Sequence, residues 1–211
     1  MVEYLVPTQF GEGEFVEKKS RFIGRLWPVE TEAEALEKIQ EMKKKHYDAT
    51  HNCWAYVIQD GPVRFSDDGE PGGTAGMPML QVLQREGLSN VVCVVTRYFG
   101  GILLGAGGLV RAYTKGAKIA VDAAGKSMKR VWTVLYLLCP YPFYERVKLE
   151  IAAFGGLVRQ TDFGAEVELE VLLPQGQTQP FLEALTDLTS GTVEAMEVAQ
   201  EYRAFPVDMP E

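Results

Sequence analysis

The chain has 211 residues, of which 46% are hydrophobic and 24% charged. It is longer than the roughly 100–150 residues of a typical domain, so we expect two compact units. No stretch approaches the ~20 apolar residues that cross a bilayer, and the first residues lack the basic start and apolar middle of a signal peptide. The composition therefore excludes a disordered chain and a helical membrane protein, and it predicts a cytoplasmic protein.

The net charge of -8 is distributed unevenly along the chain. Residues 1–130 hold 17 Lys and Arg against 16 Asp and Glu, whereas residues 131–211 hold 4 against 13. A polyanion would approach the first part and be repelled by the second. We therefore expect two domains, residues 1–130 and 131–211, with the boundary at the small basic cluster that ends at Arg130.

The first domain is expected to combine a sheet with helices, as an α+β fold. Its clearest element is a helix at 32–45. Thr31 can cap this helix, and glutamates in the first turn and lysines in the last turn complement the helix dipole. In chain order, the expected elements are a strand at 20–29, that helix, a hairpin at 52–59 and 63–66, a helix at 78–86, a buried strand at 91–96 and a long helix from Gly105 or Gly107 to Ala124.

The second domain is predicted to be a ferredoxin-like βαββαβ domain. Alternating glutamates in residues 166–171 indicate a sheet with one wet, acidic face. No motif of a catalytic site appears in this part of the sequence, and its acidity suits a protein partner. The expected elements are a strand at 133–139, a helix at 142–154, strands at 156–163 and 166–173, a helix at 179–189 and a strand at 192–202.

A glycine-rich segment lies between the buried strand and the long helix of the first domain. Five glycines occur in the nine residues from Gly100 to Gly108, so the backbone can approach a ligand and direct helix N-terminal amides at it. Arg97, Arg111 and Lys115 could neutralise an anion there. The segment is neither a Walker A loop nor a dinucleotide fingerprint. The alternative is that these glycines only permit tight packing of helix on sheet.

An acidic turn precedes the predicted helix at 78–86. Asp67, Asp68 and Glu70 could hold magnesium or share a proton for acid/base chemistry, whereas the alternative is a solvated turn. His51 and Cys53 lie nearby, but the sequence offers no second cluster of Cys and His for a zinc site. We expect His51 to be a polar residue near the glycines and the cysteines to be buried.

Four ordered motifs resemble the IMPACT/YigZ family, also called uncharacterised protein family 0029. They are SRFI at 20–23, HNCWA at 51–55, DDGEP with GTAG at 67–76, and TRYFGG with LGAGGLVRAY at 96–113. The resemblance covers residues 15–125, and the remainder resembles the C-terminal domain of bacterial members. It implies a first domain similar to the second domain of small-subunit ribosomal protein five and a second domain similar to the last domain of elongation factor G.

The resemblance implies a link to the ribosome or RNA, since eukaryotic IMPACT proteins are translational regulators. Our leading hypothesis is a non-enzymatic protein that binds RNA or a nucleotide phosphate and modulates translation, with ribosome association as one form of this role. One alternative is an enzyme on a small phosphorylated or nucleotide-like substrate, with magnesium on Asp67, Asp68 and Glu70. Another is a protein-interaction module. No membrane partner and no other cofactor is expected.

The candidate residues for binding an anion or nucleic acid lie along the four motifs and the long helix, with Lys43 to Lys45 as an extension. They are Arg21, His51, Thr74, Arg97, Tyr98, Gly100, Gly101, Gly105, Gly107, Gly108, Arg111 and Lys115.

Overall fold

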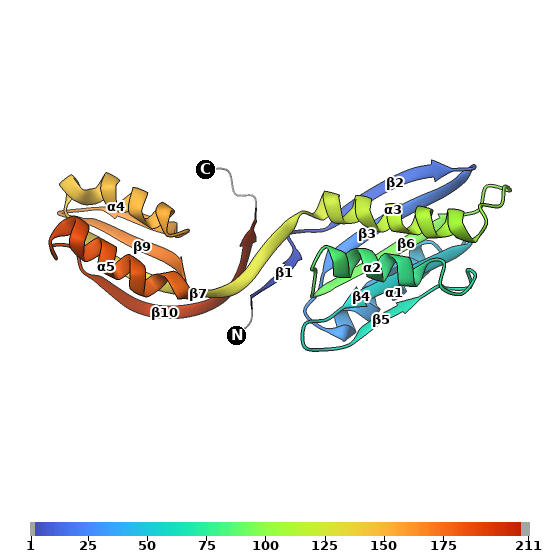
Figure 1. Cartoon of the computed structure of the whole chain (residues 1–211), viewed down its shortest axis with the longest axis horizontal. Helices are drawn as coiled ribbons and strands as arrows, with labels where there is room; N and C mark the ends of the chain where they lie inside the picture. Colours follow the sequence, from blue (N-terminus) through green and yellow to red (C-terminus); the bar gives the residue numbers. More distant parts are fainter. Residues whose placement is uncertain (1–2, 208–211) are drawn as a thin grey trace. The chain divides into compact units, whose positions relative to one another are not determined.

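The computed structural model describes residues 3–207, which form a mixed α+β protein (Figure 1). They divide into two compact units. The N-terminal unit comprises Tyr4–Met128 together with residues 204–207, and the C-terminal unit comprises Lys129–Arg203 together with Glu3. Within residues 3–207, no helix combines the length and the apolar character needed to span a membrane.

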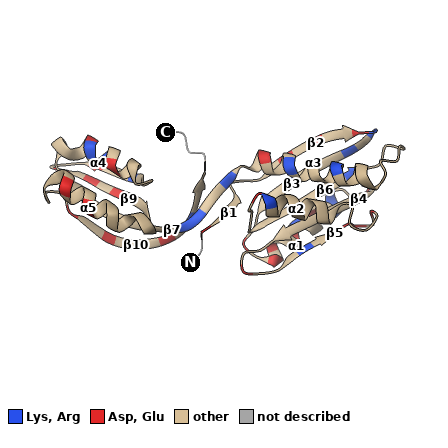
Figure 2. Ribbon diagram, in the orientation of Figure 1, with Lys and Arg blue, Asp and Glu red and all other residues tan. Residues whose placement is uncertain are grey.

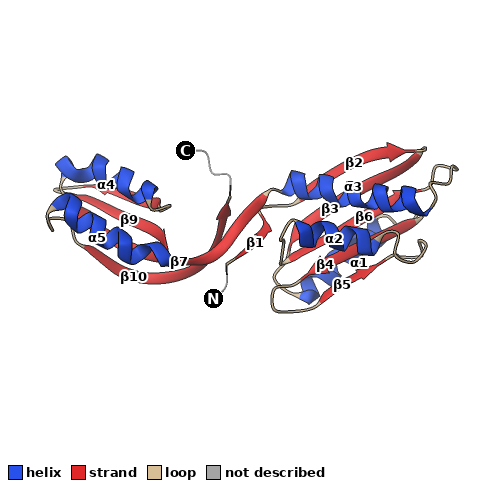
Figure 3. Ribbon diagram, viewed as in Figure 1, coloured by secondary structure: helices blue, strands red, loops and turns tan. Residues whose placement is uncertain are grey.

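The N-terminal unit is built on a five-stranded sheet with the order β2-β3-β6-β4-β5 (Figure 3). Neighbouring strands in this sheet run antiparallel. The central strand is buried on both faces because its residues alternate between two cores: Cys93 and Val95 pack into one, and Val92 and Val94 into the other. The strands are β2 (Gly11–Glu17), β3 (Ser20–Pro28), β4 (His51–Val57), β5 (Val63–Ser66) and β6 (Val91–Tyr98).

Helices cover both faces of this sheet. The core on one face holds residues of α2 (Gly76–Arg85) and α3 (Ala106–Ala124), and the core on the other holds residues of α1 (Glu32–Lys45). Helix α1 begins as predicted, with the Thr31 hydroxyl accepting a hydrogen bond from the Glu34 amide at 3.2 Å. The other elements predicted for the first domain also form, with ends within a few residues of expectation.

The sequence analysis did not predict two of the strands, β1 (Tyr4–Pro7) and β2. Strand β2 contains two glycines and three glutamates, so it lacks the alternation of large apolar residues that marks a strand. It forms because it pairs with β3 from Gly11↔Leu26 to Glu17↔Ser20 and because α3 packs on it.

The C-terminal unit has the predicted βαββαβ order and the sheet order β10-β7-β9-β8, which is the ferredoxin-like arrangement. The long strand β7 runs through residue 130, where the domain boundary was expected, and β1 also pairs with it. Helices α4 and α5 pack on one face of the sheet around Val147, Ile151 and Phe181. The elements are β7 (Lys126–Cys139), α4 (Tyr141–Ala153), β8 (Leu157–Phe163), β9 (Val167–Pro174), the 3-10 turn Gln175–Gln177, α5 (Thr178–Thr189) and β10 (Ala195–Pro206).

Candidate functional site

Two cavities in the N-terminal unit share the side chain of Leu104. We name them the basic cavity, with a volume of about 200 Å³, and the apolar cavity, with a volume of about 380 Å³. The basic cavity is lined by Phe15, Glu17, Lys18, Leu104, Gly108, Arg111, Ala112 and Lys115. The apolar cavity is lined by Thr50, His51, Gly69, Glu70, Pro71, Arg97, Phe99, Leu103, Leu104, Gly105, Ala106 and Leu109.

Three cations, Lys18, Arg111 and Lys115, line the basic cavity. Lys18 stands at the tight turn between β2 and β3, and the other two lie four residues apart on α3, on one face of the helix. Figure 2 shows Lys and Arg at this turn and on the first half of α3. Within residues 3–207, none of the three lies within ion-pair distance of a carboxylate, although Glu17 contributes to the lining. The cavity is therefore electropositive.

The first turn of α3 borders both cavities. Its first amides have no acceptor within the helix, and no side chain among the described residues caps them. Gly105 has φ +72°, a left-handed conformation that glycine adopts without strain. A Cβ at Gly107 would lie 3.6 Å from Nη1 of Arg111, so this guanidinium lies over the first turn. The amides and the Arg111 charge thus act on the same region of the surface.

Some glycines of the glycine-rich segment also permit close packing, which was the alternative interpretation of these residues. The Gly100 amide donates to Ser20 Oγ at 3.2 Å, and a Cβ at Gly100 would lie 2.0 Å from the carbonyl carbon of Lys19. A Cβ at Gly108 would lie 2.9 Å from Cβ of Leu104. Gly100 therefore holds the β2–β3 turn against the segment, while nothing lies within 4 Å of a Cβ built at Gly101 or Gly105.

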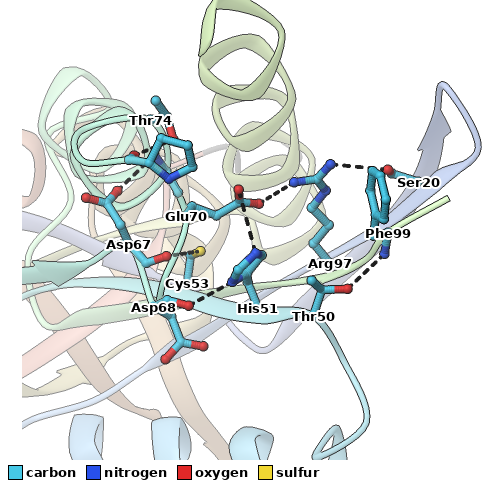
Figure 4. A network of polar contacts seen from close by, with 12 residues as sticks. Ser20, Thr50, His51, Cys53, Asp67, Asp68, Glu70, Thr74, Arg97 and Phe99 are labelled. Atoms are coloured by element: carbon cyan, nitrogen blue, oxygen red, sulfur yellow. Dashed lines mark hydrogen bonds and ion pairs between the residues drawn. The ribbon is translucent and has the colours of Figure 1, made fainter. Parts of the chain in front are cut away.

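A buried polar network forms one side of the apolar cavity (Figure 4). Arg97 Nη1 donates to Glu70 Oε1 at 2.6 Å, and the Tyr113 hydroxyl donates to the same oxygen at 2.7 Å. Burial raises the pKa of the Tyr113 hydroxyl, so it remains a donor at neutral pH. Arg97 was predicted to bind phosphate, but its guanidinium is buried and bonded to Glu70. We therefore assign it a positioning role within the network.

His51 joins this network through both ring nitrogens. Nδ1 lies 2.8 Å from the carbonyl oxygen of Asp68, which can only accept, so Nδ1 carries the hydrogen. Nε2 faces Glu70 Oε2 at 3.7 Å, and His51 is one of the residues that line the apolar cavity. His51 and Gly105 line the same cavity, which agrees with the expectation of a polar residue near the glycines.

The three carboxylates of the acidic turn bond to different partners. Asp67 accepts from the backbone amides of Gly73, Ala75 and Gly76 at 2.8 to 3.0 Å, so it caps α2. Asp68 pairs with Lys43 Nζ at 2.6 Å and accepts from the Asn52 amide at 2.7 Å. Glu70 faces Arg97. Among residues 3–207, no three His, Cys, Asp or Glu side chains are grouped closely enough to hold a metal ion. The structure therefore does not bring these carboxylates together as magnesium ligands.

Three further candidates bond within the protein. Arg21 pairs with Glu14 at 2.5 Å on the surface of β2 and β3. The Tyr98 hydroxyl contacts Nδ1 of His46 at 2.8 Å. The hydroxyl of Thr74, which is buried, donates to the Pro71 carbonyl at 2.6 Å and stabilises the turn before α2. Each side chain thus has a partner within the protein, and its contact with an anion or nucleic acid stays a prediction.

The three cysteines are buried and free. Burial raises the pKa of the Cys53 thiol, which donates to the Asp67 carbonyl at 3.0 Å, and raises the pKa of Cys93 to about 12. A thiol must lose its proton to act as a nucleophile, so neither residue is suited to covalent chemistry at neutral pH.

The sequence analysis missed Lys18, Phe99 and Leu104 as site residues. Lys18 had no clear signal, because residues 11–17 lack the alternation that marks a strand and Lys-Lys is not a pair that hairpin turns favour. Phe99 and Leu104 had none, since an apolar residue that lines a cavity looks like any core residue in the sequence.

The family comparisons cover most of the chain. A family model described as the Impact N-terminal domain matches residues 18–121, and one described as a domain of unknown function (DUF1949) matches residues 137–192. The chain is 41% identical to IMPACT family member YvyE of Bacillus subtilis, covering 94% of this chain and 93% of that protein. It is 35% identical to IMPACT family member YigZ of Escherichia coli, covering 87% and 92%.

Two further matches differ in their extent. Protein IMPACT of Homo sapiens is 36% identical over 110 residues, which is 49% of this chain and 34% of that protein. A solved structure described as that of a hypothetical protein has a TM-score of 0.59 and 34% identity, and the match covers 94% of this chain and 98% of that one. The similarity to human IMPACT therefore extends over half of this chain, whereas the bacterial relatives match both units.

Proposed function

Since the chain belongs to the IMPACT family, we propose that it is a non-enzymatic protein that binds RNA or a nucleotide phosphate and thereby modulates translation. One observation carries the proposal: Lys18, Arg111 and Lys115 line a single cavity beside the uncapped start of α3. The translational part rests on the resemblance to eukaryotic IMPACT proteins. Similarity of the N-terminal unit to the second domain of ribosomal protein five remains a prediction.

The cations of this cavity are not paired with carboxylates within residues 3–207, although Lys115 Nζ lies 4.4 Å from the centroid of the Phe15 ring. Elsewhere in the N-terminal unit, Arg25, Lys43 and Lys126 form ion pairs with carboxylates. The three cations of the basic cavity have no such partner within residues 3–207, and Glu17 alone would leave an excess of positive charge. Nucleic acid binding draws on unneutralised Lys and Arg, because each phosphate contact releases counterions.

The proposal is tested by the salt dependence of RNA binding, measured by fluorescence anisotropy with a labelled oligoribonucleotide. We expect affinity to fall steeply between about 50 and 200 mM salt. Lys115→Gln is expected to weaken binding and to reduce the salt slope by about one. Lys118→Gln is the matched control, because it removes the same charge from the same helix, where Lys118 pairs with Glu86 and Asp122.

Two results would contradict the proposal. One is an affinity that stays constant across this salt range. The other is an equal loss of affinity in Lys115→Gln and Lys118→Gln, because a uniform effect of net charge would then explain the binding.

A second candidate function is a protein contact on the C-terminal unit. A cavity of about 550 Å³ is lined there by Tyr136, Leu138 and Met196 together with Glu166 and Glu194. Exposed apolar side chains beside acids suit a basic protein segment that also buries apolar groups. Photo-crosslinking from a probe at position 196 should capture one basic partner, and a probe at Leu149 of α4, which is also exposed, should not.

A further inference from the structure

The two cavities have Leu104 as a shared lining residue. Gly108 and Ala112 line the basic cavity, and Gly105 and Leu109 line the apolar one, so the first turns of α3 form a wall of both. A single ligand that carries an anionic group next to an apolar ring can therefore occupy the two cavities together. A nucleotide has this composition.

The apolar cavity is built like a small-molecule site. Its volume of about 380 Å³ lies within the range of about 300–1,000 Å³ that is typical of ligand pockets. Phe99 and Leu103 line it although they are 45% and 81% exposed, respectively. An exposed leucine and an exposed aromatic ring that line the same cavity favour burial against a ligand.

The Phe99 ring is held in place by its surroundings. Arg97 Cζ lies 5.4 Å from its centroid, and Glu70 fixes Arg97 from the other side (Figure 4). The Phe99 amide donates to Thr50 Oγ1 at 3.0 Å, which fixes the backbone. A ring held in this way loses little freedom when a base stacks on it, and stacking on an aromatic side chain is how unpaired bases bind proteins.

Polar atoms at the edge of the cavity complement a base. Glu70 and His51 both line it. Arg97 and Tyr113 donate to Oε1 of Glu70, and the carboxylate can accept further hydrogen bonds through Oε2. The amino and ring N–H groups of a nucleobase are donors that such a carboxylate can bind.

We infer that the apolar cavity binds an unpaired nucleobase of single-stranded RNA while the neighbouring phosphate lies in the basic cavity. This inference rests on the proposed function and specifies its ligand. Bases within a duplex are paired and stacked, so they cannot enter the cavity, whereas duplex phosphates can still reach Lys18, Arg111 and Lys115. The protein therefore prefers single strands, and the preference depends on Phe99 and Leu103.

The experiment compares two labelled RNAs by anisotropy, a single-stranded octamer and a duplex of the same sequence, at one fixed salt concentration. Phe99→Ala and Leu103→Ala are expected to weaken single-strand binding about tenfold and to leave duplex binding unchanged. Leu149→Ala is the matched control, because this leucine is 72% exposed on α4 in the C-terminal unit. Arg111→Gln should lower the affinity for both RNAs by the same factor.

The outcomes separate this inference from the proposed function. Suppose that Arg111→Gln weakens RNA binding, whereas Phe99→Ala and Leu103→Ala change the affinity for neither RNA or change both affinities equally. The inferred base pocket is then wrong, and the proposed phosphate site is retained. If the wild-type protein binds neither RNA, both proposals fail. Circular dichroism of each variant shows that the fold is retained, and Leu103, being exposed, can be replaced without opening the core.

Discussion

Glu70 holds Arg97 in a buried ion pair across 27 positions of the sequence, with Oε1 2.6 Å from Nη1. The same oxygen accepts from Tyr113, so one carboxylate joins the acidic turn, the central strand β6 and helix α3. Both side chains of the pair are almost fully buried. The loss of either partner would leave the other as an unpaired charge inside the protein.

Glu70→Ala is expected to lower the free energy of unfolding by about 3–5 kcal/mol, because it leaves the Arg97 charge unpaired in the protein interior. Urea denaturation measures this change. The control is Glu14→Ala, which breaks the exposed pair with Arg21 and should have little effect. Equal effects of the two substitutions would show that the Glu70 pair is not a buried anchor.

Asp67→Ala is expected to destabilise the protein by about 2 kcal/mol, because the backbone amides of Gly73, Ala75 and Gly76 lose their acceptor. Hydrogen exchange of α2 should accelerate in the same variant. Asp122→Ala removes an exposed carboxylate from α3 and serves as the control. Unchanged exchange in α2 would argue against the capping role.

Gly100→Ala is expected to cost about 1–3 kcal/mol, because the new Cβ would lie 2.0 Å from the Lys19 carbonyl carbon and this backbone atom cannot move alone. Gly72→Ala is the matched control, since no atom lies within 4 Å of a Cβ built there. Thermal unfolding of the two variants gives the comparison. Similar midpoints would mean that the β2–β3 turn shifts without cost.

The pH dependence of stability should reveal the contacts of Glu86. Hydrogen bonds from Lys126 and Lys118 hold its pKa below the ordinary value of 4.5. Because the folded state binds the proton less readily than the unfolded state, this stabilisation is complete above pH 4.5 and is lost as the pH falls through the lower, folded pKa. Glu86→Gln should therefore be less stable than wild type at neutral pH, and the difference should disappear in acid. A constant difference would contradict this.

Local signals explain why most of the fold could be predicted. Helix α1 has its cap, its acids and its lysines within its own sequence, so Thr31 marked its start correctly. Strand β2 could not be predicted, because its pairing and its contact with α3 are tertiary. At Gly24 of the neighbouring strand, a Cβ would lie 2.1 Å from the Gly116 carbonyl oxygen, and the sequence of neither segment shows this close approach.

The site was predicted less completely for the same reason. Arg111 and Lys115 were expected to act together because their spacing places them on one helix face. In the structure they line one cavity, and their binding of an anion stays a prediction. Arg97 was expected to bind phosphate because the sequence shows its charge but not the carboxylate of Glu70 beside it. A charge becomes available to a ligand only when the fold leaves it unpaired, and that depends on residues far away in the chain.

The β2–β3 turn has a consequence for protein engineering. Lys18 and Lys19 both adopt positive φ, 45° and 64°, where a two-residue hairpin would favour Asn-Gly. Replacing the pair by Asn-Gly should make the protein more heat-resistant while it removes a cation from the basic cavity. Thermostability and ligand affinity would then trade off at the same two positions, so a screen for stability alone would select against binding.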